Sequence, residues 1–132
     1  MSIKSDYLMD MVMRFCEAVL RALDARKAGD ADQALEEYED VVGSALDMPA
    51  DCALALSGPS LLSMVQLSAV DETLVTYCVY ALNRVADIYE DPRPDLAALR
   101  REQASALAQG YGFDVDVTPR EVQEALASRA NA

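Results

Sequence analysis

The chain has 132 residues, an apolar fraction of 52% and a formal net charge of −12. These values fit one globular domain with its own hydrophobic core and exclude a disordered chain. Acidic residues outnumber basic ones 23 to 11, so the surface repels phosphate backbones and anionic lipids, and we expect neither a nucleic-acid nor a membrane partner. The three cysteines, Cys16, Cys52 and Cys78, are too scattered for a disulfide framework, which predicts a cytoplasmic protein with buried, reduced thiols.

Residues 6–47 are predicted to form an antiparallel helical hairpin. Apolar residues recur at spacings of three and four along both halves, as on one face of a helix. Gly29 ends the first helix and Asp30 is a good N-cap for the second. Because the connection between them is so short, the two helices have to pack side by side in opposite directions. Met9 and Met13 widen the apolar stripe of the first helix, so we expect this helix to be covered on more than one side.

Residues 49–68 are predicted to form two short helices, which begin near Pro49 and Pro59. The uncharged stretch 52–70 is about long enough to cross a bilayer. It is interrupted by Gly58 and Pro59 and contains several serines, so a buried helix pair is the better interpretation.

A second helical hairpin is predicted over residues 71–109. Its first helix covers residues 71–89. Apolar residues on one face of this helix are predicted to point into the core: Leu74, Val75, Cys78, Ala81, Leu82, Val85, Ile88 and Tyr89. Pro92 and Pro94 separate it from a helix over residues 95–109.

The C-terminal part is predicted to contain a linker and one more helix. Gly110 and Gly112 end the preceding helix, and residues 110–117 form an extended linker. Thr118 is the expected N-cap of a helix over residues 118–130. The chain is therefore predicted to be a single all-α domain of about five to seven helices.

Two hairpins in succession suggest a helical repeat. The segment 25–38 is similar to the turn and second helix of a tetratricopeptide repeat, and Ala34 and Tyr38 match that repeat's A-x3-F step. The chain also resembles a family of small, uncharacterised bacterial proteins described as tetratricopeptide-like, which begin with an Asp-Tyr-apolar helix as at Asp6. This resemblance implies stacked helical hairpins and carries no assigned activity.

The residue types argue against an enzyme. There is no histidine, which removes the Ser-His-Asp, Cys-His and HExxH arrangements together. The cysteines lack CxxC spacing, and Asp114 and Asp116 lack the glycine and final glutamate of a calcium loop. We therefore predict no catalytic residue, no metal site and no cofactor. An enzyme that uses paired carboxylates remains a minor alternative.

The acidic second helix is the main candidate binding surface. No Lys or Arg occurs from residue 28 to residue 83, and the helix carries Glu36, Glu37, Glu39 and Asp40. These side chains either form a solvated face that maintains solubility or dock a basic protein partner.

The fifth helix offers a second candidate surface. Tyr77, Tyr80 and Arg84 lie off its predicted inward stripe, and Tyr and Arg are enriched in interface cores. We therefore predict a protein–protein interaction module. The alternative is a structural homo-oligomer, in which Met9, Met13 and the apolar stretch 52–70 are covered by a second copy.

Overall fold

The computed structural model describes the backbone over residues 3–131 and the side chains over residues 6–131. Over this range the chain forms seven α-helices and no strand, which confirms the all-α prediction. The helices are α1 (Ile3–Lys27), α2 (Ala31–Leu46), α3 (Ala50–Leu54), α4 (Gly58–Leu67), α5 (Glu72–Tyr89), α6 (Pro94–Tyr111) and α7 (Arg120–Ala130).

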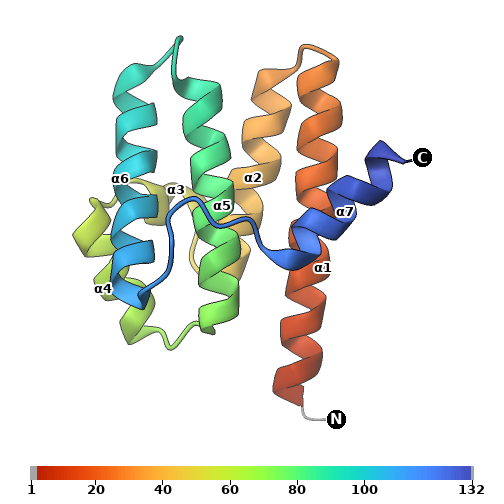
Figure 1. Cartoon of the computed structure of the whole chain (residues 1–132). Helices are drawn as coiled ribbons and strands as arrows, with labels where there is room; N and C mark the ends of the chain where they lie inside the picture. The colour runs from red at the N-terminus through yellow and green to blue at the C-terminus, as the bar shows by residue number, and fades with distance from the viewer. Residues whose placement is uncertain (1–2, 132) are drawn as a thin grey trace.

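Two antiparallel hairpins, α1–α2 and α5–α6, stand side by side with their connecting turns at the same end of the molecule (Figure 1). The central helix α5 packs against α1, α2 and α6. The short helices α3 and α4 join the two hairpins; α3 packs on α2, and α4 packs on α6. The last helix, α7, crosses α1 (Figure 1).

Helices α2 and α5 each begin at an aspartate that caps the first turn. The Asp30 carboxylate accepts a hydrogen bond from the backbone N–H of Gln33 at 3.0 Å, as predicted for the start of α2. Asp71 accepts from the N–H of Thr73 at 2.8 Å and caps α5. Gly29 has φ = +80°, the left-handed conformation that lets the chain reverse between α1 and α2.

Helix α5 is buried around most of its circumference, and 12 of its 18 residues are buried. The prediction of a single inward stripe is therefore too narrow. The side of α5 opposite α2 is covered by the C-terminal part of the chain. Asn83 donates from Nδ2 to the carbonyl of Val115 at 2.8 Å, and the Tyr77 hydroxyl donates to the Glu121 carboxylate in α7.

Two predicted boundaries differ from the structure. Helix α6 continues through Gly110 to Tyr111, and Gly112 ends it with φ = +77°. A Cβ at residue 110 would lie 2.5 Å from Leu62, so this glycine allows close packing of α4 on α6 rather than ending the helix. Thr118 is not the cap of α7, because the helix begins one residue later than predicted, after Pro119.

Helix α1 is covered on more than one side, as predicted, because it packs against α2, α5 and α7. Met9 and Met13 lie outside this covered surface and are 59% and 60% exposed. None of the helices within residues 3–131 is both long and apolar enough to cross a membrane.

Replacing Gly58 with alanine is expected to destabilise the protein. Alanine is normally better than glycine in a helix by about 1 kcal/mol. At Gly58, however, the new Cβ would lie 2.7 Å from the backbone carbonyl oxygen of Glu102, which has no freedom to move away. We expect Gly58→Ala to lower the free energy of unfolding by about 1–3 kcal/mol in urea denaturation. Ser63→Ala, at an exposed position of the same helix, is the control, and a more stable Gly58→Ala protein would contradict this packing.

Candidate functional site

An open groove of about 810 Å³ lies between α2, α3 and α6. Four leucines, two alanines and the half-buried Tyr89 form its apolar part, and carboxylates from α2 and α3 lie around it. The lining residues are Asp32, Leu35, Glu36, Glu39, Asp40, Ala50, Asp51, Leu54, Ala55, Tyr89, Leu96, Leu99 and Arg100. The acidic helix of the sequence analysis therefore forms one wall of a concave site.

Four carboxylates of this groove carry charge that no neighbour offsets. Asp32, Glu36, Asp40 and Asp51 are exposed, and no basic side chain within residues 6–131 pairs with any of them. Asp51 accepts a hydrogen bond from the backbone N–H of Cys52 at 3.0 Å, which places its carboxylate at the start of α3. These four groups give the groove a negative potential.

Two of the predicted contact residues are instead paired within the fold. Glu37 lies 2.8 Å from Nε of Arg21 in α1, and Glu39 lies 3.3 Å from Nη2 of Arg100 in α6. Glu37 and Glu39 therefore have basic partners in the fold, although no Lys or Arg occurs from residue 28 to residue 83. Burial raises the pKa of Glu39, while the charge of Arg100 opposes that rise. Of the four predicted acids, Glu36 and Asp40 remain exposed.

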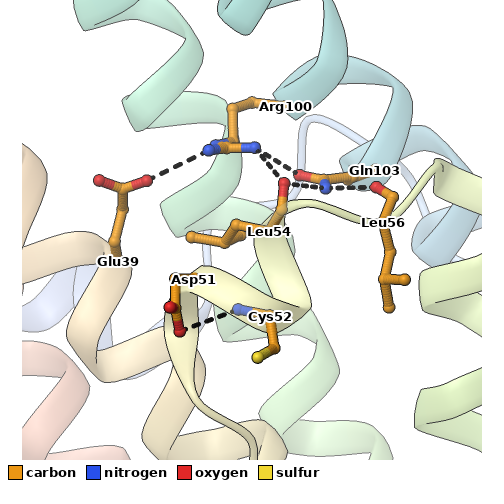
Figure 2. Close-up of polar contacts among 7 residues, drawn as sticks. All are labelled: Glu39, Asp51, Cys52, Leu54, Leu56, Arg100 and Gln103. Atoms are coloured by element: carbon orange, nitrogen blue, oxygen red, sulfur yellow. Dashed lines mark hydrogen bonds and ion pairs between the residues drawn. The ribbon is translucent and has the colours of Figure 1, made fainter.

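Arg100 and Gln103 of α6 form hydrogen bonds to the end of α3, which is one side of the groove (Figure 2). Both side chains are buried. The carbonyl of Leu54 accepts from Nη1 of Arg100 at 2.8 Å and from Nε2 of Gln103 at 3.0 Å. The same Gln103 nitrogen donates to the carbonyl of Leu56 at 2.8 Å, and Gln103 Oε1 accepts from Arg100 at 3.3 Å.

This network supplies hydrogen-bond donors to carbonyl groups at the end of α3. Helix α3 has only five residues, so its last carbonyls have no partner within the helix. A buried carbonyl without a hydrogen bond is costly, and the two side chains of α6 supply the missing donors. Arg100 thereby links α3 to α2 through Glu39.

The second predicted surface does not exist as an exposed patch. Tyr77 and Tyr80 are 1% and 7% exposed, since α5 is covered on this side as well, so their assignment as surface contacts is wrong. Burial and the hydrogen bond to Glu121 raise the pKa of Tyr77. Arg84 remains partly exposed, with its guanidinium carbon 5.0 Å from the centre of the Tyr80 ring.

The cysteines occupy three different environments. Cys78 is buried and Cys16 half-buried, and burial raises the pKa of both thiols. Cys52 is exposed on α3, so its interpretation as a core residue is wrong. Within residues 6–131 no three Cys, Asp or Glu side chains are placed to hold a metal ion.

Part of the groove has no local signal in the sequence. Asp32, in the first turn of α2, and Asp51 of α3 are not among the contact residues predicted from the sequence. The apolar part was also missed, because Leu54 and Leu96 are 42 positions apart and meet only in the folded chain. A cluster of acids on one helix was the only local signal for this site.

Substitution of Gln103 tests the network. We expect Gln103→Leu to lower the free energy of unfolding by about 1–3 kcal/mol, because the Leu56 carbonyl loses its donor and Arg100 loses an acceptor. Gln109→Leu, at an exposed position of α6, should change it by less than about 0.5 kcal/mol. Equal effects of the two substitutions in chemical denaturation would contradict the role of Gln103.

The Glu39 carboxyl should make stability depend on pH. Its folded-state pKa is raised above its ordinary value of 4.5, so the folded protein binds this proton more readily than the unfolded chain does. Lowering the pH from about 7 toward 4.5 should therefore raise the free energy of unfolding relative to that of Glu39→Gln. Urea titrations of both proteins at each pH measure this difference, and a constant or falling difference would show that the pKa is not raised.

Comparison with known proteins leaves the chain without an assigned family. No protein-family model, curated protein or solved structure matches it. The resemblance to tetratricopeptide-like proteins thus remains a prediction, and the function has to be argued from the groove.

Proposed function

We propose that the protein is an interaction module that binds a basic, amphipathic protein segment in the groove between α2, α3 and α6. The observation that carries the proposal is the combination of four unpaired carboxylates with an apolar floor in one groove. The carboxylates would pair with lysine or arginine side chains of the segment. The apolar floor would bury the leucine-like side chains on its other face.

Charge placement supports this proposal over a purely solvated face. Four exposed acids line one open groove of about 810 Å³, and none of them has a basic partner within residues 6–131. Glu39, beside them, is already neutralised by Arg100. A segment entering the groove would therefore meet uncompensated negative charge next to apolar surface, which favours fast, salt-sensitive association.

The arrangement of the helices supports a tetratricopeptide-like affiliation as a further part of the proposal. Two antiparallel hairpins follow one another, and α5 of the second packs against both helices of the first. In repeat proteins such stacking produces extended binding surfaces.

Self-association is the second candidate function, and a different observation favours it. Among residues 6–131, five large apolar side chains are exposed, all on α1 and α4, and Leu67 is 83% exposed. These residues are Tyr7, Met9, Met13, Met64 and Leu67. Such an interface between copies would be apolar and insensitive to salt.

A synthetic helical peptide with lysines on one face and leucines on the other tests the proposed function. We expect it to bind the natural chain at ~20 mM salt and to bind at least tenfold more weakly at ~300 mM salt, because the carboxylates become screened. The triple variant Asp32→Asn, Glu36→Gln, Asp40→Asn should lose most of this affinity in fluorescence anisotropy titrations. Glu39 is left unchanged because its partner Arg100 is buried.

The matched control changes the net charge by the same amount elsewhere. Asp91→Asn, Glu102→Gln, Asp116→Asn removes three exposed carboxylates that lie outside the groove and form no ion pair with residues 6–131. This control should bind like the natural chain. If both triple variants weaken binding equally, only the net charge matters and the groove is not the site. A mass that rises with protein concentration in ultracentrifugation, without peptide binding, would support self-association instead.

A further inference from the structure

Two basic side chains stand out because they have no acidic partner. Ten basic residues lie within residues 6–131, and eight of them lie within 4.0 Å of a carboxylate. The exceptions are Arg26 and Lys27, which follow one another in the last turn of α1. In a chain with twice as many acids as bases, two adjacent unpaired cations are unexpected.

Both cations line a pocket of about 370 Å³ between α1, α2 and α5. A third cation, Arg84 of α5, lines the same pocket, together with Tyr38 of α2. The remaining lining residues are Leu23, Ile88 and Asp87. Helices α1 and α5, which are distant in sequence, therefore bring three positive charges to one concave site on a strongly acidic protein.

Arg84 is held in a position suited to binding. Its guanidinium stacks on the Tyr80 ring at 5.0 Å, and its Nε lies 3.1 Å from Asp87 Oδ2 in a geometry that makes no hydrogen bond. The other oxygen of Asp87 lies 2.9 Å from Nη2 of Arg101, which shares the charge of that carboxylate. Neither Nη group of Arg84 donates a hydrogen bond to residues 6–131, so both are available as paired donors.

Tyr38 adds a neutral donor to this site. Its ring is buried, and burial raises the pKa of its hydroxyl to about 12, so the group carries its proton at neutral pH. The positive charges of Arg84 and Arg26 lower the pKa of this hydroxyl and so oppose the effect of burial.

We infer that this pocket binds the phosphate group of a small organic phosphate monoester. The lining residues carry three positive charges and one negative charge, which matches a dianion better than a single carboxylate. Arginine binds phosphate through paired N–H groups, and lysine adds a point charge. Leu23, Ile88 and the ring of Tyr38 provide apolar contact for the organic part of the ligand.

A purely local role explains only part of this cluster. Cations in the last turn of a helix favourably offset the negative end of its dipole, which accounts for Arg26 and Lys27 on α1. It does not account for Arg84, which lies on α5, or for the position of all three cations around one concavity. This site is separate from the acidic groove and does not depend on the proposed docking function.

Titration with inorganic phosphate and with phenyl phosphate tests the inference. Backbone amide NMR spectra of the full chain are recorded at constant ionic strength, with sodium chloride as the reference titration. We expect saturable shifts around Lys27, Tyr38 and Arg84 with a Kd in the millimolar range, on the order of 1 mM. Phenyl phosphate should bind about fivefold more tightly than inorganic phosphate, because its ring meets apolar surface.

Three variants separate a binding role from a structural one. Lys27→Gln, at an exposed helix end, and Arg84→Gln should each weaken phosphate binding about tenfold. Arg120→Gln removes one exposed charge at the start of α7 and should bind phosphate like the natural chain. Shifts that do not saturate or that match those from chloride would overturn the inference. An unchanged affinity of the folded Lys27→Gln protein for phosphate would also overturn the inference, even if Arg84→Gln failed to fold.

Discussion

Helix α5 is buried on several sides, so each neighbouring element has to supply either apolar surface or a hydrogen bond to it. The first hairpin and α6 supply apolar surface. The remaining side needs polar partners, because Tyr77 and Asn83 bring a hydroxyl and an amide into the interior. The segment after α6 provides them through Glu121 and the carbonyl of Val115. This requirement explains why the segment after α6 runs across α5 before α7 crosses α1 (Figure 1).

The acidic groove depends on a second polar requirement. Helix α3 is too short to satisfy its own carbonyls, and Arg100 and Gln103 reach across from α6 to bind them (Figure 2). A buried guanidinium needs an anion, which Glu39 provides. One carboxylate of the acidic helix is thereby used inside the protein, and its neighbours Glu36 and Asp40 remain on the groove with their charge unpaired.

Unpaired acidic and unpaired basic side chains line different concave sites of the molecule. Uncompensated acids surround the groove of α2, α3 and α6, while the unpaired cations of α1 join Arg84 in a separate pocket. Both concavities include side chains of α2, so one helix contributes to two sites of opposite potential. A net charge of −12 describes neither site, since the sign of the local field is decided by which side chains remain unpaired after folding.

The sequence by itself determined the all-α class, both hairpins and the cap at Asp30, because these depend on periodicity and on contacts within a few residues. It also located the acidic helix. Only the tertiary structure decided the rest: that Gly110 lies inside α6, that Tyr77 and Tyr80 are buried, and which acids are paired. Each of these features involves partners that are distant in sequence, such as Leu62 for Gly110 and Arg100 for Glu39, and no local pattern encodes such partners.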